Sequence, residues 1–126
     1  DRPSELLETS TLFSLSSRSE GTSISLLEAM SSGLCPVVTR VGGNEAVLGP
    51  ALAHRLVPPE DPTALAAGWR SALTDVAGRS RDAALGRARV VENYGIATVV
   101  GRHVALYREV TARPGALTSH PGRHEN

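Results

Sequence analysis

SRSEGTSISLLEAMSSGLCPVVTRVGG, residues 17–43, carries the signals of a loop, a helix and a buried strand in close succession. Its middle part places apolar residues at helical spacing, which predicts a helix over 23–32. Gly33 follows as a stop, because glycine readily adopts the left-handed conformation that ends many helices. The β-branched run PVVT at 36–39 is typical of a short strand. The segment therefore predicts the helix and the second strand of a strand, helix, strand unit.

The same alternation of short strands and helices continues on both sides of this segment. Strands are expected at 11–16, 36–39 and 54–58, and helices at 3–9, 23–32, 62–75, 80–93 and 96–111. This order is typical of an α/β fold with a doubly wound parallel sheet. Because three strands are too few for a complete Rossmann-type domain, we expect a partial, Rossmann-like sheet.

The chain is expected to contain one domain, at residues 1–112, followed by a disordered tail at 113–126. Its 126 residues, 40% of them hydrophobic, suit a single core. The tail is rich in Pro, Gly, Ser and His, a composition that buries too little apolar surface to order itself.

Charge, cysteine content and hydropathy exclude several classes of protein. The 13 basic residues balance 13 acidic ones, so no net field attracts nucleic acid. Cys35 is the single cysteine, which excludes an internal disulfide and a cysteine metal cluster. No apolar run approaches the ~20 residues that cross a bilayer, and the first residues do not resemble a signal peptide. We expect a cytoplasmic protein, with the inner face of the cell membrane as an alternative location.

The start of the helix at 23–32 has the features of an anion-binding site. Glu20 and Gly21 end the preceding loop, and a glycine there permits a positive φ or a close approach to a ligand. The first amides of a helix lack intrahelical acceptors and lie at the positive end of its dipole. The N–H groups of Gly21, Thr22, Ser23 and Ile24 are therefore candidates to hold a diphosphate.

Two glutamates bracket this anion-binding site. Glu20 precedes the helix, and Glu28 lies one to two turns inside it. A carboxylate has two acceptor oxygens, which suit the vicinal hydroxyls of a ribose or a hexose. The spacing is therefore typical of a site for a nucleoside diphosphate sugar, with the phosphates on the helix between two hydroxyl-bearing ends.

At these residues the chain resembles the retaining GT-B glycosyltransferases of glycosyl transferases group 1, which share a Glu-x7-Glu motif. The matching positions are Glu20-Gly21, 27–30 (Leu-Glu-Ala-Met), Gly33, 36–38 (Pro-Val-Val) and 41–43 (Val-Gly-Gly). The resemblance implies a C-terminal, donor-binding half-domain of a GT-B fold. It assigns the nucleotide ribose to Glu28, the donor sugar and the catalytic role to Glu20, and the diphosphate to the amides that follow Glu20.

The resemblance also implies a reaction and its partners. The expected reaction is retaining transfer of a hexose from a nucleotide sugar to a carbohydrate or lipid-linked acceptor, as in polysaccharide biosynthesis. It requires no metal or cofactor, but it does require an acceptor-binding N-terminal domain that this chain lacks. We therefore expect the chain alone to be incomplete and inactive. Two alternatives are a non-catalytic nucleotide-binding remnant of such an enzyme and part of a GT-B sugar epimerase.

Residues outside this motif are assigned structural roles. Trp69, Met30 and Cys35 are expected to pack in the core, His54 to lie in a strand, and His103 to lie on a helix surface. Arg18 is expected to be solvated, with a phosphate contact as the alternative. The helix arginines are expected to form a solvated face, with contact to an anionic membrane surface as the alternative; they are Arg79, Arg81, Arg87 and Arg89.

Overall fold

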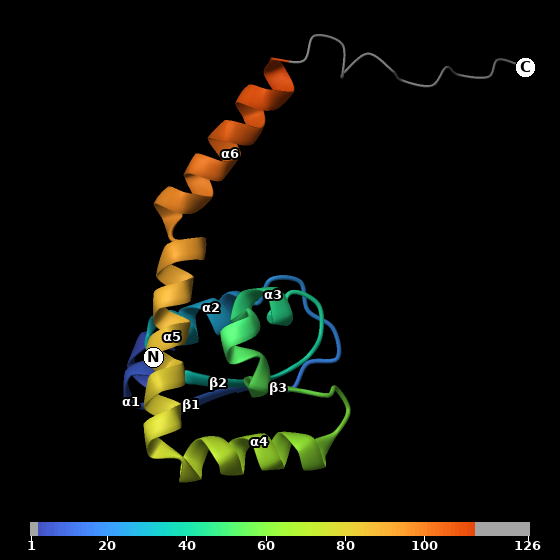
Figure 1. The fold of residues 1–126 in the computed structure, drawn as a ribbon, viewed down its shortest axis with the longest axis vertical. Coiled ribbons are helices and arrows are strands. Elements are labelled where there is room, and N and C mark those ends of the chain that lie inside the picture. The colour runs from blue at the N-terminus through green and yellow to red at the C-terminus, as the bar shows by residue number, and fades with distance from the viewer. Residues whose placement is uncertain (1–2, 113–126) are drawn as a thin grey trace, which may run out of the picture. The chain divides into compact units, whose positions relative to one another are not determined.

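The computed structural model describes residues 3–112, so the expected tail lies outside the described residues. The described residues divide into two compact units, 3–94 and 95–112. The first unit contains α1 (Pro3–Thr9), β1 (Leu12–Leu15), α2 (Ile24–Ser31), β2 (Cys35–Thr39), α3 (Asn44–Leu48), the 3-10 helix η1 (Pro50–Arg55), β3 (Leu56–Val57), α4 (Pro62–Thr74) and α5 (Val76–Tyr94) (Figure 1).

The three strands form one parallel sheet in the order β1, β2, β3. The register pairs Leu12 with Cys35 and Val38 with Leu56. All five residues of the central strand β2 are buried, whereas β1 is half-buried along its length. Each connection between strands passes through helices, as parallel pairing requires. The expected α/β fold with a partial parallel sheet is therefore confirmed.

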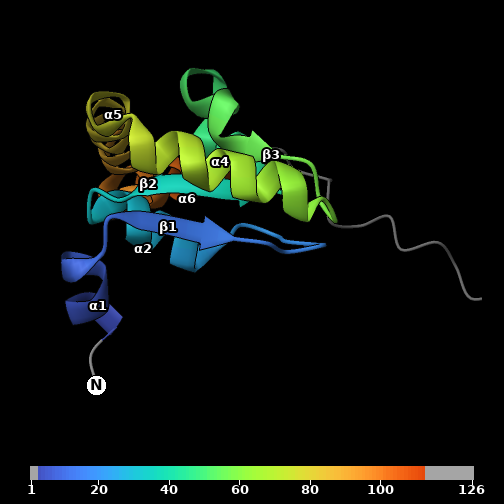
Figure 2. The same cartoon turned by 90° about the horizontal axis from the view of Figure 1, so that it is seen from below.

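Helices cover both faces of this sheet, and Figure 2 shows α4 and α2 on opposite sides of it. Side chains alternate between the faces because consecutive strand residues point in opposite directions. On one face Val38 packs with Leu26 and Met30 of α2, both fully buried. On the other face Val37 packs with Ala72 of α4. Complete burial of a Leu or Met side chain contributes roughly 1.5–3 kcal/mol, so β2 is stabilised from both sides.

The strand expected at 54–58 is wrong in its first part. Residues 50–55 form η1, and β3 contains only Leu56 and Val57. Proline at position 50 favours a helical start. The side chains of His54 and Arg55 then bind Asp82 of α5, so this segment is held by contacts distant in sequence. The short helix α3 was also not expected from the sequence.

Asp82 is almost completely buried, with 1% of its surface exposed, and it connects η1 to α5. Its Oδ2 accepts hydrogen bonds from His54 Nε2 at 2.6 Å and Arg55 Nε at 2.8 Å. Arg81 Nε lies 3.3 Å from Oδ1. Burial by itself would raise the pKa of Asp82, but the hydrogen bonds from His54 and Arg55 outweigh burial and lower it.

The expectation that the arginines of α5 form a solvated face is confirmed for Arg81 and Arg87, which are exposed, and wrong for Arg79 and Arg89. The Arg81 side chain is 67% exposed and pairs with the neighbouring Asp82 of the same helix. Arg89 donates to the backbone oxygens of Ala46 and Val47, both at 2.8 Å, and so caps the end of α3. Arg79 donates to the backbone oxygens of Ala72 and Leu73 at the end of α4. The side chains of Arg79 and Arg89 fix α5 against its neighbours.

The core assignments made from the sequence are confirmed in two cases and wrong in one. Met30 and Cys35 are fully buried, and burial raises the pKa of the Cys35 thiol. Trp69, in contrast, is 40% exposed, and its Nε1 donates to Ser14 Oγ of β1 at 2.8 Å. Because β1 is the outer strand of this sheet, the helix face above it is only partly covered.

The second unit contains α6 (Ile96–Thr111). No residue of this helix is buried, and His103 lies on its surface as expected. Its imidazole Nδ1 lies 2.8 Å from the backbone oxygen of Val99, one turn earlier. Within residues 3–112 no helix is both long and apolar enough to cross a membrane.

The loop after β1 and the loop after β2 pack backbone against backbone. Gly43 N donates to Gly21 O at 3.0 Å. Gly42 has φ of 50°, and a Cβ on it would overlap the backbone oxygen of Glu20. A Cβ on Gly43 would lie 2.5 Å from Gly21 O. The two glycines are therefore required by this contact, which fixes the position of Glu20.

Replacing Asp82 by Asn should destabilise the first unit by about 3 kcal/mol or more at pH 7, because Arg55 would remain buried without its counter-charge. Because the pKa of Asp82 lies below its ordinary value of 3.8, the stabilisation by its carboxylate is complete above about pH 4. It is lost as the pH falls below that value. Urea unfolding at pH 7 and at pH 3 should show the difference between wild type and D82N shrinking at the lower pH.

Arg81→Ala provides the matched control, since its side chain is 67% exposed. Its removal should change the free energy of unfolding by less than about 1 kcal/mol. A D82N protein as stable as wild type at pH 7 would contradict the assigned role.

Replacing Gly42 by Ala should destabilise the chain by at least about 1–2 kcal/mol, because the positive φ and the contact with Glu20 both exclude a Cβ. Gly101→Ala is the control, since a Cβ on Gly101 in α6 would meet no atom within 4 Å. That change should be neutral or stabilising in a helix. Thermal unfolding of both variants tests the contact, and equal melting temperatures would refute it.

Candidate functional site

The candidate site lies at the carboxyl edge of the sheet, where the loops after β1, β2 and β3 meet. Ligands of open α/β sheets bind outside this edge. Thr39 at the end of β2 donates from Oγ1 to Ser17 O at 2.7 Å, and so joins the first two loops. Arg18 of the first loop pairs with Glu60 of the third at 3.0 Å. All three loops therefore contribute to one surface.

The start of α2 leaves a row of backbone donors unused. Ser23 is the N-cap, and its Oγ accepts from Leu26 N at 3.3 Å. Its backbone oxygen accepts from Leu27 N at 3.2 Å. Within residues 3–112 no acceptor is bonded to the amides of residues 21–25. These five consecutive N–H groups include all four amides predicted from the sequence, and they lie at the positive end of the helix dipole.

Gly21 differs in one respect from the sequence-based prediction. Its φ is not positive, so the first of the two reasons given for a glycine here does not apply. A Cβ on Gly21 would meet no atom of the described chain within 4 Å, so the protein itself does not require glycine here. The space above this residue is open. Close approach of a ligand, the other reason proposed for this glycine, stays a prediction.

Glu20 is positioned by its own loop. Ser17 Oγ donates to Glu20 Oε1 at 2.6 Å, and the side chain is partly buried. Since Ser17 O also accepts from Thr39, a chain of two hydrogen bonds connects the end of β2 to this carboxylate. Ser17 binds one carboxylate oxygen of Glu20, and the other oxygen makes no hydrogen bond or ion pair within residues 3–112. The hydrogen bond from Ser17 restricts the orientation of the Glu20 carboxylate but does not neutralise its charge.

Glu28 lies on the exposed side of α2, one turn after the unused amides. Its side chain makes no hydrogen bond or ion pair within residues 3–112. The next residues, Ala29 and Met30, are fully buried, so they fix the face of α2 on which Glu28 stands. A ligand can therefore bind the exposed carboxylate of Glu28 without breaking a hydrogen bond or ion pair within residues 3–112.

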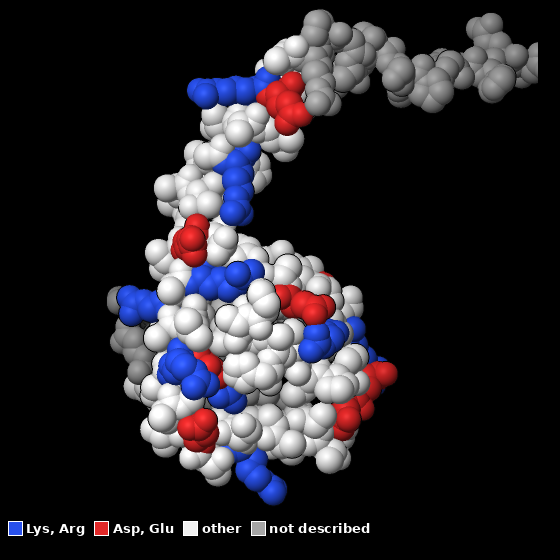
Figure 3. All heavy atoms as spheres, in the orientation of Figure 1, with Lys and Arg blue, Asp and Glu red and all other residues white. Residues whose placement is uncertain are grey.

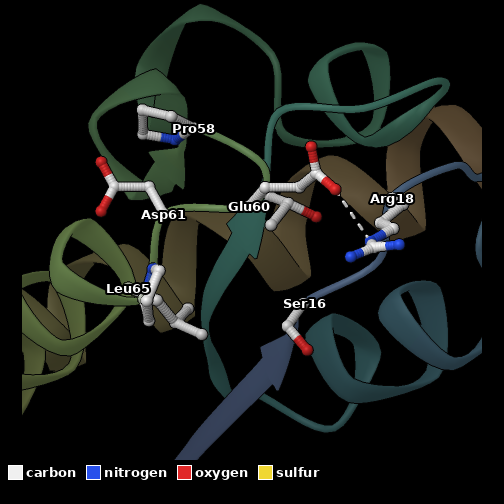
Figure 4. A pocket seen from close by; sticks show the side chains of 8 residues that line it. Ser16, Arg18, Pro58, Glu60, Asp61 and Leu65 are labelled. Atoms are coloured by element: carbon white, nitrogen blue, oxygen red, sulfur yellow. Dashed lines mark ion pairs between the residues drawn. The ribbon is translucent and has the colours of Figure 1, made fainter.

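A cavity of about 350 Å³ opens at the same edge (Figure 4). It lies between the loop after β1 and the start of α4. Its lining combines polar and apolar side chains: Ser16, Arg18, Thr39, Pro58, Glu60, Asp61, Pro62 and Leu65. None of the six residues predicted from the sequence as the site lines this cavity. It adjoins their loop through Ser16 and Arg18.

Two acidic residues line the cavity and make different contacts. Asp61 is the N-cap of α4, and its Oδ1 accepts from Ala64 N at 2.8 Å. Glu60 has φ of 58° and reaches toward Arg18 across the cavity, as Figure 4 shows. Both side chains of the Arg18 and Glu60 pair are largely exposed, so the pair contributes little stability. Arg18 is thus exposed as expected, and the contact with a phosphate stays an alternative prediction.

Sequence reasoning did not identify Thr39, Glu60 or Asp61 as residues of this edge. The Glu60-Asp61-Pro62 turn carries a sequence signal for a helix start but none for a ligand site. The position of Thr39 at the end of a buried strand would have placed it at the carboxyl edge. Its contact with Ser17 depends on the parallel register of β1 and β2. Within the described residues no group of three or more His, Cys, Asp or Glu side chains is arranged to hold a metal ion.

Comparison with known proteins agrees with this geometry. The model of the family "Glycosyl transferases group 1" matches residues 1–89. The structure is similar to that of sucrose-phosphate synthase from Thermosynechococcus elongatus, with a TM-score of 0.76 and 27% sequence identity. The similarity covers 85% of this chain but only 27% of that chain. No curated protein sequence matches significantly.

The family match covers the sheet, the unused amides of α2 and both glutamates of the predicted motif. The structural neighbour is a GT-B glycosyltransferase, so the parallel sheet described above is similar to part of a GT-B domain. The chain belongs to the glycosyl transferases group 1 family.

Proposed function

We propose that this chain is the donor-binding part of a retaining GT-B glycosyltransferase that uses a nucleoside diphosphate sugar. The observation that carries the proposal is the row of five amides without acceptors, residues 21–25, beside the carboxylate of Glu20. A diphosphate provides acceptors for several of these N–H groups at once. No other group in a nucleotide sugar matches such a row of donors.

The two glutamates then receive the roles that the family resemblance implies. Glu28, exposed and without a protein partner, accepts hydrogen bonds from the ribose hydroxyls. Glu20, held by Ser17 near the first amides, approaches the donor sugar and is the proposed catalytic residue. The backbone amides between the two carboxylates hold the phosphates.

The proposed catalytic effect is electrostatic. When the bond from sugar to phosphate breaks, negative charge grows on the departing diphosphate, and fixed amide dipoles stabilise it without reorganising. Arg18 is the cation nearest to these amides in the sequence, and it is paired with Glu60. Further positive charge is proposed to come from outside this chain. The proposal requires no metal ion or other cofactor.

The chain spans about a quarter of the structure that it resembles. The acceptor, a carbohydrate or a lipid-linked sugar, is proposed to bind largely on an N-terminal domain outside this chain. Accordingly, we propose that residues 1–112 are the C-terminal portion of the donor domain and that sugar transfer needs both domains. Turnover by this chain alone would contradict the proposal. The expected cytoplasmic location stays a prediction.

Glu28→Ala should weaken binding of the matching nucleoside diphosphate by about tenfold or more, because two hydrogen bonds to a charged group are lost. Calorimetric titration of the chain with UDP, ADP and GDP measures this. Glu5→Ala is the control, since Glu5 is also an exposed helical glutamate but precedes β1, at the opposite edge of the sheet.

Three outcomes separate the possible functions. Loss in E28A with no loss in E5A supports the proposed role of Glu28. Equal loss in both variants indicates a general charge effect and argues against it. If wild type binds none of the three nucleotides, the proposed nucleotide site is wrong.

Gly21→Ala should separate folding from ligand binding. Because a Cβ on Gly21 meets no protein atom and its φ is not positive, the variant should melt within about 1 °C of wild type. The added methyl group would occupy the space assigned to the diphosphate, so nucleotide affinity should fall by about tenfold or more. A variant that melts normally and binds nucleotide as wild type does would contradict the proposed phosphate position.

A further inference from the structure

A second cavity, of about 440 Å³, lies at the amino edge of the sheet, opposite the proposed donor site. Its residues precede β1, precede β2, or belong to α5: Ser10, Thr11, Gly33, Arg79, Ser80, Ala83, Ala84 and Arg87. A Cβ on Gly33 would meet no atom within 4 Å, so the cavity is open at that point. The donor site lies at the carboxyl ends of the strands, so one ligand cannot occupy both.

The charge of this cavity is entirely positive among the described side chains that line it. Arg79 and Arg87 contribute two guanidinium groups, and no Asp or Glu is in the lining. Ser80 and Thr11 add hydroxyl groups, which donate to or accept from an oxyanion. Figure 3 shows basic side chains spread along α5. An unbalanced pair of guanidinium groups in a concave site favours an anion.

The four arginines of α5 differ in the contacts that they make. Arg81 pairs with Asp82, and Arg89 caps α3. Arg79 uses Nη1 for the backbone oxygens of Ala72 and Leu73, at 3.0 and 3.2 Å, which fixes its position. Arg87 is exposed and makes no hydrogen bond or ion pair within residues 3–112.

Arg79 and Arg87 also share one face of α5 with the small residues Ala83 and Ala84 between them. Eight residues of helix separate their Cα atoms by about 12 Å. The short alanine side chains leave space above the helix between the two guanidinium groups. One of the two arginines is thus held in place, the other is free to close on a ligand, and the space between them is vacant.

We propose that this cavity binds a phosphate-bearing organic ligand at a site separate from the donor site. Guanidinium groups recognise phosphate through paired N–H donors, and the hydroxyls of Ser80 and Thr11 suit the remaining oxygens. The volume lies within the range of roughly 300–1,000 Å³ typical of small-molecule sites, and it exceeds what one phosphate ion fills. The phosphate belongs to a soluble sugar phosphate or to the headgroup of an anionic lipid.

Arg87→Ala is the decisive variant, because Arg87 supports no described contact and its loss should not disturb folding. The full chain is titrated with inorganic phosphate and with a hexose phosphate by calorimetry. It is also sedimented with vesicles of phosphatidylcholine alone and with added phosphatidylglycerol. Binding of a phosphate-bearing probe should weaken by about tenfold or more in R87A.

Two controls define the result. Arg70→Ala removes an exposed arginine of α4 that lines a different cavity, and it should bind as wild type does. Glu28→Ala should also leave this binding unchanged, because Glu28 belongs to the donor site. Binding of the hexose phosphate that depends on Arg87 supports a soluble ligand. Binding only to phosphatidylglycerol vesicles, again dependent on Arg87, supports a lipid headgroup.

Two other results would contradict the proposed site. If R70A and R87A lose affinity equally, the attraction is a general effect of charge and no specific site exists. If wild type binds neither the soluble phosphates nor the anionic vesicles, the cavity has no such ligand. Melting temperatures of R87A and R70A close to that of wild type confirm that folding is not responsible.

Discussion

The contact of the Gly42-Gly43 turn with the backbone of Glu20 and Gly21 is the constraint on which the candidate site depends. It joins the loops after β1 and β2 without any side chain between them. The loop after β1 is therefore held against the sheet edge while its own backbone donors stay unpaired. Fixed, unpaired amides are what an anion site needs, because donors that are already oriented lose little entropy on binding.

The local part of the fold could be predicted from the sequence. The apolar spacing around Leu26 and Met30 and the β-branched run of β2 identify α2 and the central strand, and both are buried as predicted. The region 50–58 could not be predicted, because its conformation depends on Asp82, which lies 27 positions beyond Arg55 in the chain. Trp69 was misassigned for a related reason. Its exposure is decided by the outer position of β1 and not by its helical spacing.

The candidate site also has one part that the sequence predicts and another part that it does not. The amides of α2 and the two glutamates lie within one continuous segment, so spacing alone brings them together. The adjoining cavity needs three loops from three strands, and its residues Thr39 and Glu60 have no sequence signal that links them to Arg18. Only the parallel order of β1, β2 and β3 places them at one edge. The residues of a site within one segment can be predicted from the sequence. The residues of a site built by several loops can be predicted only when the sheet topology is known.

The arginines show how one residue type serves two purposes in this fold. Lysine is absent, so every positive side chain is a guanidinium with several donors in a plane. Arg55 and Arg89 use these donors on a buried carboxylate or on helix carbonyls, which gives each a structural role. At the carboxyl edge Arg18 is paired with Glu60, and amide dipoles remain the main attraction for an anion. At the amino edge Arg79 and Arg87 have no acidic partner in the cavity lining. We therefore propose that the two edges attract anions by different physical means, dipoles at one and full charges at the other, and that screening by salt weakens the second far more than the first.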